Sequence, residues 1–295
     1  MNRTKRANFM LQHMALKKKI PCVLAGIFLV LIVWTAWGNT ALELNTYTIS
    51  SRELPDAFDD YRIAQVSDLH NAKFGDGNQR LLEILREAEP DMIAITGDLI
   101  DSRKTNIVVA LAFAKEAVKI APCYYVSGNH EARVSEYQDL KTGLEEAGVT
   151  VLDDAQVKIE VSGESITVIG VNDPSFHADY LTSDAEVMDR KLSELSSEDA
   201  GFTILLSHRP ELFDTYVAHD MDLVLTGHAH GGQFRLPLIG GLIAPDQGLF
   251  PKYDAGLYSE GNTNMIVSRG LGNSIIPFRF NNRPEVVLIE LKSQN

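Results

Sequence analysis

The sequence contains little cysteine: two residues in a chain of 295, Cys22 and Cys123. Cys22 lies in an apolar segment and Cys123 in an expected strand, so we expect no disulfide between them and no disulfide framework. Apolar neighbours predict that Cys123 is a buried core side chain and not a nucleophile. Internal repeats and low-complexity tracts are absent as well. The composition, 45% hydrophobic and 23% charged, is that of a globular protein.

Acidic residues are absent from the first 38 positions, which carry six Lys and Arg. From Ile20 to Trp37 the chain lacks charge altogether, and these 18 residues are about the minimum for a helix that crosses a bilayer. Trp34 and Trp37 suit the membrane interface, and the cationic cluster marks the other end as cytoplasmic. We therefore predict a basic cytoplasmic segment over residues 1–19 and a transmembrane anchor over residues 20–38.

Two other interpretations of this segment stay open. A cleaved signal peptide is compatible with the small residues Ala36 and Gly38, although its apolar run is normally only about 7 to 15 residues long. A buried helix of a soluble protein fits less well, because the segment is apolar all round and three lysines flank it. With a retained anchor, the protein is a single-pass protein of the cell membrane whose domain lies outside the cytoplasm.

Basic residues are scarce beyond the anchor. Removing the six N-terminal cations leaves 21 Lys and Arg against 40 Asp and Glu, a net charge of about −19. Such a surface repels a phosphate backbone, so nucleic acid is not expected as a partner. Anionic substrates remain compatible with this charge if bound cations dominate locally.

Apolar strands and amphipathic helices alternate along the chain. Residues 39–60 predict a linker with a first strand at 45–50, and residues 231–258 predict irregular loops. We expect further strands at 61–67, 91–96, 123–127, 202–207, 223–226, 265–268 and 285–291, short strands within 149–172, and helices at 78–89, 106–119, 136–147 and 184–195. The alternation favours a mostly parallel sheet with helices on both faces. Residues 61–295 are predicted to form one domain, with two sheets packed face to face.

Side chains that bind metals follow five of these strands. They are Asp68 and His70, then Gly97-Asp98, Gly128-Asn129-His130-Glu131, His208, and finally Gly227-His228-Ala229-His230. A single acidic residue after a strand is usually a helix N-cap, and a single histidine is usually a satisfied core residue. Five such positions at one sheet edge favour a shared site. Mixed nitrogen and oxygen donors suit manganese, iron or zinc better than calcium.

The ordered set D-x-H, G-D, G-N-H-E, H and G-H-x-H, over residues 61–231, resembles the calcineurin-like metallophosphoesterases. The resemblance implies an α/β fold, an αββα sandwich of two mixed sheets, that holds two divalent metal ions. It assigns Asp68, His70 and His230 to the first ion, Asn129, His208 and His228 to the second, and Asp98 to both. It also implies attack on phosphorus by a hydroxide that the two ions activate, with His130 as the catalytic acid or transition-state stabiliser and Glu131 in support.

The sequence departs from the family at one point. Some members continue the second motif as G-D-x-x-D-R, but here Ser102 separates Asp101 from Arg103, which argues against a phosphate clamp at Arg103. Asp101 is then expected to be a cap or a support for the site. Arg209 fits a surface position before Pro210 as well as a place in the site.

The tail is similar to the membrane-associated bacterial phosphodiesterase branch of this family, some members of which act on phospholipids or UDP-diacylglucosamine. The similar residues are Ser268-Arg269-Gly270-Leu271-Gly272, Pro277 and Arg279. We therefore predict a hydrolase of phosphodiester or pyrophosphate bonds in a lipid, a phosphorylated small molecule or an envelope substrate. The alternatives are a phosphomonoesterase, such as a phosphoprotein phosphatase, and a non-catalytic metal-dependent binding module. A second set of residues either lines a lipid-facing rim or, as we favour, packs in the core: Phe74, Phe234, Leu236, Ile239 and Leu242.

Overall fold

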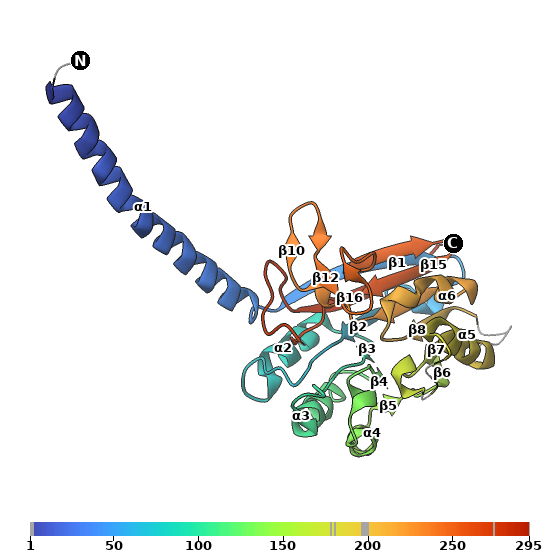
Figure 1. Ribbon diagram of the computed structural model, residues 1–295. Coiled ribbons are helices and arrows are strands. Elements are labelled where there is room, and N and C mark those ends of the chain that lie inside the picture. The colour runs from blue at the N-terminus through green and yellow to red at the C-terminus, as the bar shows by residue number, and fades with distance from the viewer. Residues whose placement is uncertain (1–2, 178, 180, 196–200, 274, 295) are drawn as a thin grey trace.

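The structure is a computed structural model that describes residues 3–177, 179, 181–195, 201–273 and 275–294. It begins with α1 (Arg3–Gly38), one long helix that stands away from the rest of the chain (Figure 1). The window Pro21–Gly38 has a mean hydropathy of 2.1, and no part of it is buried. Within the described ranges, α1 is the one helix long and apolar enough to cross a membrane.

Two six-stranded sheets form the rest of the fold (Figure 1). The first contains, in spatial order, β1 (Glu43–Ser51), β16 (Glu285–Ser293), β2 (Arg62–Val66), β3 (Met92–Thr96), β4 (Cys123–Val126) and β5 (Thr150–Val151). The second contains β14 (Gly256–Glu260), β15 (Thr263–Val267), β9 (Leu223–Thr226), β8 (Thr203–Leu206), β7 (Glu164–Gly170) and β6 (Ala155–Val161). Both are mixed, because β16 runs antiparallel to β2, β14 to β15, and β6 to β7, whereas the other neighbours are parallel.

Three apolar cores separate four layers. Side chains alternate along each strand, so Ala64 and Val66 of β2 face the helices while Ile63 faces the second sheet. The outer helices of the first sheet are α2 (Gln79–Ala88), α3 (Ile107–Ala117) and α4 (Tyr137–Ala147), and those of the second are α5 (Asp184–Leu195) and α6 (Phe213–Ala218). The predicted αββα sandwich is thus confirmed.

Two sequence-based expectations need correction. Helices do not cover both faces of one sheet, because the inner face of each sheet packs on the other sheet. Residues 231–258 are not wholly irregular: they contain the start of β14 and two small hairpins, β10 (Arg235–Leu236) with β11 (Gly240–Gly241) and β12 (Ile243–Ala244) with β13 (Gly248–Leu249). Strands of two residues carry too few side chains for a periodic pattern, so the sequence gives no sign of them.

The segment before residue 61 contributes to the sheet. Strand β1 pairs with β16 in parallel over nine positions, from Glu43 opposite Glu285 to Ser51 opposite Ser293. The chain that leads out of α1 is therefore an edge strand of the first sheet.

The carboxyl ends of the central strands of both sheets meet at one edge of the sandwich. Beneath that edge the buried Gln65 of β2 donates through Nε2 to the Thr226 carbonyl of β9, at 2.8 Å, and to the Thr96 hydroxyl of β3, at 3.1 Å. This polar bridge fixes the two sheets against each other where the predicted ligands begin.

Candidate metal centre

The backbone turns sharply at the ends of these strands. Five of the seven predicted ligands have left-handed backbone, with φ between 44° and 64°: Asp68, His70, Asp98, His228 and His230. This conformation costs a non-glycine residue about 1–2 kcal/mol. Strain of this kind gathers at functional sites, where the surrounding structure holds it in place.

Glycines allow the strand ends to approach one another. A Cβ atom on Gly227 would overlap the Ser67 hydroxyl and the Asp68 carboxylate. Gly97 has a φ of +89°, and a Cβ there would lie 2.7 Å from His208 Nδ1. The glycines of the G-D and G-H-x-H motifs are therefore required by close packing around the site.

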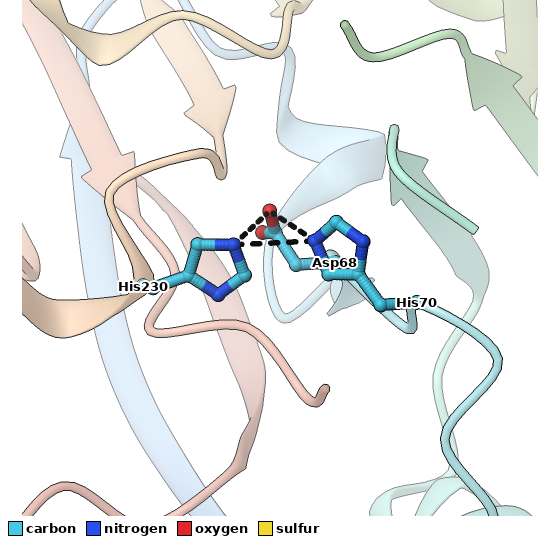
Figure 2. A group of neighbouring side chains, drawn as sticks. All are labelled: Asp68, His70 and His230. Atoms are coloured by element: carbon cyan, nitrogen blue, oxygen red, sulfur yellow. Dashed lines mark hydrogen bonds and ion pairs between the residues drawn. The ribbon is translucent and has the colours of Figure 1, made fainter. Parts of the chain in front are cut away.

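Asp68, His70 and His230 form a first buried group (Figure 2). His230 Nε2 lies 3.4 Å from Asp68 Oδ1 and 3.2 Å from His70 Nε2. His70 Nε2 lies 3.8 Å from the same carboxylate oxygen. Asp68 and His70 follow β2 of the first sheet and His230 follows β9 of the second, so both sheets supply this group.

Asn129, His208 and His228 form a second group beside the first, next to Asp98. His208 Nε2 lies 3.2 Å from both Asp98 Oδ2 and His228 Nδ1. The Asn129 amide oxygen lies 3.0 Å from His228 Nδ1 and 3.3 Å from His208 Nε2. Hydrogen bonding within the protein alone would favour the reversed amide, whereas a cation between these atoms requires the oxygen to face inward.

Asp98 connects the two groups. Its Oδ2 atom lies 3.5 Å from His70 Nε2 in the first group and 3.2 Å from His208 Nε2 in the second. Its other oxygen accepts the backbone N–H of His130 at 2.8 Å. One carboxylate is thus shared between both groups.

Two histidines use one ring nitrogen in a hydrogen bond to the protein and keep the other available as a metal ligand. His208 Nδ1 donates to the Thr96 carbonyl at 2.7 Å, and His228 Nε2 donates to Asp246 at 2.9 Å. In the neutral rings, His208 Nε2 and His228 Nδ1 then carry lone pairs that point at each other. This arrangement fits a metal ion, because ligating histidines normally donate their second N–H to a carbonyl or carboxylate.

Strong coupling between carboxylates and imidazoles shapes the electrostatics. Burial raises the pKa of Asp98, but the charge and hydrogen bond of His208 outweigh this and lower it well below its ordinary value. For Asp68, His230 and His70 likewise outweigh burial and lower the pKa. Burial lowers the pKa of His208, but Asp98 outweighs burial and raises it to about 10. Cations that bind here would replace protons held between these groups.

Comparison with known proteins identifies the family. The model of the calcineurin-like phosphoesterases matches residues 61–232, which is more than half of the chain and includes every residue of both groups. The chain belongs to the calcineurin-like phosphoesterase family. It is similar to the metallophosphoesterase YkuE of Bacillus subtilis (strain 168), with 32% identity over 265 residues, which are 86% of this chain and 87% of the relative.

Two further proteins are similar to this chain. The phosphodiesterase YaeI of Escherichia coli (strain K12) is 27% identical over 237 residues, 78% of this chain and 82% of that protein. The crystal structure of TT1561 from Thermus thermophilus superposes with a TM-score of 0.51 at 16% identity and covers 72% of this chain and 90% of that one. The last comparison concerns the fold alone.

His130 lies against the metal-binding groups of this phosphoesterase. Its ring meets the His70 ring edge-on, with centroids 4.5 Å apart. Nδ1 accepts the backbone N–H of Ser102 at 3.0 Å, so in the neutral ring the proton resides on Nε2. Burial lowers the pKa of His130 to about 4; the charge of Asp98 opposes this shift and that of His70 adds to it. The ring is therefore neutral near pH 7.

Glu131 faces the backbone and not the ligand atoms. Its carboxylate accepts the N–H groups of Asp98 and Gly128, each at 2.8 Å, and of Ile100 at 3.1 Å. It thereby ties together the loops that follow β3 and β4 in the phosphoesterase fold.

Asp101 and Arg103 pair with each other. The Arg103 guanidinium makes two hydrogen bonds to Asp101, at 3.0 and 2.7 Å. Asp101 Oδ1 also lies 3.6 Å from His130 Nδ1. Asp101 Oδ1 also accepts the Arg103 backbone N–H at 2.9 Å, so Asp101 caps this turn beside His130 and holds Arg103.

A network of charged side chains behind His228 was not predicted from the sequence. Arg209, whose side chain is 3% exposed, bonds to Asp173 through Nε and through Nη2. It also pairs with Asp246, which in turn accepts from His228. The surface position considered for Arg209 is therefore wrong. Only tertiary contacts bring these residues together, and Asp173-Pro174 and Asp246 carry no local signal.

Arg279 also reaches the centre. It is buried, and its guanidinium lies 3.4 Å from His230 Nδ1 while donating to the backbone carbonyls of Arg269 and Gly272. Burial lowers the pKa of His230, and the positive charge of Arg279 lowers it further, although Asp68 acts in the opposite direction. Arg279 therefore disfavours the doubly protonated, cationic form of His230.

Proposed function

We propose that this phosphoesterase is a membrane-anchored, dinuclear metal-dependent phosphodiesterase. The observation that carries the proposal is the convergence of seven buried donors from both sheets, with the Asp98 carboxylate between two groups of three. A single cation would need only one such group. A carboxylate shared by both groups suits a pair of ions.

Each side chain has a distinct task in this proposal. Asp68, His70 and His230 would hold the first ion, Asn129, His208 and His228 would hold the second, and Asp98 would contribute to both sites. When bound, two divalent cations such as Mn, Fe or Zn polarise a phosphoryl oxygen and activate water for in-line attack. No serine or cysteine nucleophile is needed, in keeping with the buried Cys123.

His130 supplies a hydrogen-bond donor beside the proposed ions. Because its Nδ1 accepts from Ser102, the neutral ring presents an N–H at Nε2. Such a group donates a hydrogen bond to developing negative charge on a phosphoryl oxygen, whereas transfer of a proton to the leaving oxygen would require the cationic ring. Glu131 joins the two loops that carry Asp98 and His130, and so fixes the position of these two side chains relative to each other.

The membrane anchor is the reason for proposing a lipid or envelope substrate. Helix α1 would hold the domain at the outer face of the cell membrane, where tethering raises the local concentration of lipid and envelope substrates. The relative YaeI carries the name phosphodiesterase. The pairing of Arg103 with Asp101 leaves it poorly placed to clamp a phosphomonoester. Of two reporters fused to the carboxyl terminus, the one that works only outside the cytoplasm should be active. Activity of the one that works only in the cytosol would contradict the proposed orientation.

The decisive experiment compares two chromogenic esters. Purified full-length protein with manganese should hydrolyse bis-p-nitrophenyl phosphate faster than p-nitrophenyl phosphate, and Asp98→Ala and His130→Ala should each lose at least about 100-fold in rate. A strong preference for the monoester would instead support a phosphatase. No turnover of either ester, with metal bound, would support a binding module.

A further inference from the structure

Large apolar side chains stand exposed on the segments that follow His230 and on the loop that precedes β16. They are Leu238 and Ile239 in the β10–β11 hairpin, Leu249 and Phe250 after β12, and Ile275 and Phe278 in the loop before β16, each at least 46% exposed. We call these six side chains the apolar rim. Of the residues weighed from sequence, Ile239 belongs to it, whereas Phe74 is buried and Phe234, Leu236 and Leu242 are half-buried.

Hydrogen bonds join the segments of the apolar rim into one unit. Gln233 Nε2 donates to the Phe278 carbonyl at 2.6 Å, and Arg235 N donates to the Phe280 carbonyl at 3.0 Å. Phe250 N donates to the Leu242 carbonyl at 2.9 Å. The segments that carry the rim are therefore connected to one another and form one surface.

An apolar groove leads from the rim to the metal centre. It has a volume of about 200 Å³ and reaches His230, a member of the first metal-binding group. Apart from His230 and Gln233, its walls are apolar and include Ile243, Ile275 and Ile276. Burial against such walls gives a polar substrate no favourable free energy of binding, whereas it does for a hydrocarbon chain.

The rim is fastened to the end of α1. Asn39, the residue after this helix, donates to the Arg279 carbonyl at 2.9 Å and accepts the Arg279 N–H at 2.8 Å. The Arg283 guanidinium lies over the Trp37 ring, 4.8 Å from its centroid. In Figure 1 the β10 hairpin and the red loop before β16 both stand on the side of the domain from which α1 leaves.

We propose that the apolar rim docks into the surface of the bilayer that α1 spans. The inference rests on the membrane anchor in the proposed function and adds a second, independent contact between domain and lipid. Large apolar side chains that gather on the surface mark interaction sites, and hairpin tips with Leu, Ile and Phe suit insertion at the headgroup level. Because Arg279, the chain neighbour of Phe278 in the rim, is bonded to Asn39 at the end of α1, the bilayer is the surface nearest to the rim.

Docking would open the groove toward the lipid. A hydrocarbon chain could then leave the bilayer along apolar walls while its phosphoester reaches the metal centre. The substrate class that fits is a phosphodiester or pyrophosphate amphiphile with at least one long apolar chain.

The test uses full-length protein with Cys22→Ala, so that the buried Cys123 is the remaining native thiol. Phe250→Cys is labelled with an environment-sensitive fluorophore and reconstituted into vesicles of phosphatidylcholine and phosphatidylglycerol. Doxyl-labelled phosphatidylcholine should quench this label at least twofold and its emission should shift to the blue. The matched control is Val108→Cys, which is 70% exposed in α3 on the other side of the domain and should show neither effect.

Adding Leu238→Asp and Ile239→Asp should reduce the quenching at position 250, since both hairpins insert together. Equal quenching at both labelled positions, no quenching at position 250, or quenching that the aspartates leave unchanged would overturn the proposal. A blue shift without lipid quenching would indicate contact with a second protein copy and would also overturn it. The readout needs neither metal nor turnover, so its failure is distinct from failure of the proposed hydrolysis.

Discussion

His228 illustrates how one residue serves both the ions and the fold. Its Nδ1 faces the second metal-binding group, while Nε2 donates to Asp246, and the hydrogen bond from His228 together with the charge of Arg209 lowers the pKa of Asp246. Asp246 is half-exposed and contributes little to the core. Its role is to hold the orientation and tautomer of the imidazole.

Asp246→Asn should therefore weaken metal binding more than stability. We expect a loss of about 10- to 100-fold in manganese affinity and in turnover of the diester, measured by metal titration, with nearly unchanged thermal unfolding. The control is Asp214→Asn, whose side chain is 82% exposed and distant from the ligands, and which should behave as wild type. Equal effects of the two substitutions would contradict a role for Asp246 behind His228.

Cys123 gives a prediction that depends on pH. Burial raises the pKa of this thiol to about 12. The folded protein holds the thiol proton more tightly than the unfolded chain, so this contribution to stability is complete below about pH 9 and is lost as the pH rises toward 12. In a Cys22→Ala variant, iodoacetamide should not modify native protein at pH 8 and should modify it rapidly in urea. Fast alkylation of the folded protein at pH 8 would show that Cys123 is accessible.

At the scale of elements, Glu131 fastens the loops after β3 and β4. Its two oxygens accept three backbone N–H groups, those of Asp98, Ile100 and Gly128. In Glu131→Gln one oxygen becomes an NH₂ group, which cannot accept and would face a backbone donor. The expected cost is about 1–3 kcal/mol for each buried donor left without a partner.

Urea unfolding of the metal-free protein should show this loss for Glu131→Gln. Because Asp98 and His130 sit on the same loops, diester turnover should fall as well. Glu136→Gln is a suitable comparison, since Glu136 is exposed and should change neither quantity. Full stability of Glu131→Gln would mean that the loops are held by other contacts.

The elements predicted from sequence are those whose signal is local. The apolar runs before Asp68, Asp98 and His228 are buried strands, and each ends where a ligand was expected. The small hairpins within 231–258 and helix α6 escaped prediction because two to six residues carry too little periodicity. The contact between Arg209 and Asp246 was not predicted for another reason: the two residues meet across 37 positions of sequence, and nothing near either residue signals the contact.

On the scale of the whole molecule, each metal-binding group spans the interface between the sheets. Asp68 and His70 belong to the first sheet and His230 to the second. Asp98 and Asn129 likewise face His208 and His228 across the sandwich. The sheets are also joined at this edge by apolar packing, by the bridge from Gln65 to Thr226, and by backbone hydrogen bonds from Leu271 and Gly272 to the carbonyls of Ser67 and Asp68. Ions that contact both sides would therefore act as cross-links between the two halves of the fold.

Metal removal should accordingly lower the stability of the entire domain and not merely its activity. A ligand present at about 1,000 times its dissociation constant stabilises the native state by about 4 kcal/mol, which is roughly 10 °C in the unfolding midpoint for a domain of this size. Calorimetry of manganese-loaded protein before and after EDTA should show a shift of that order in a single transition, because both sheets lose the same ties. In Asp98→Ala, which lacks the shared carboxylate, EDTA should produce a much smaller shift. A large shift in wild type that is equally large in Asp98→Ala would place the stabilising ions elsewhere than between the sheets.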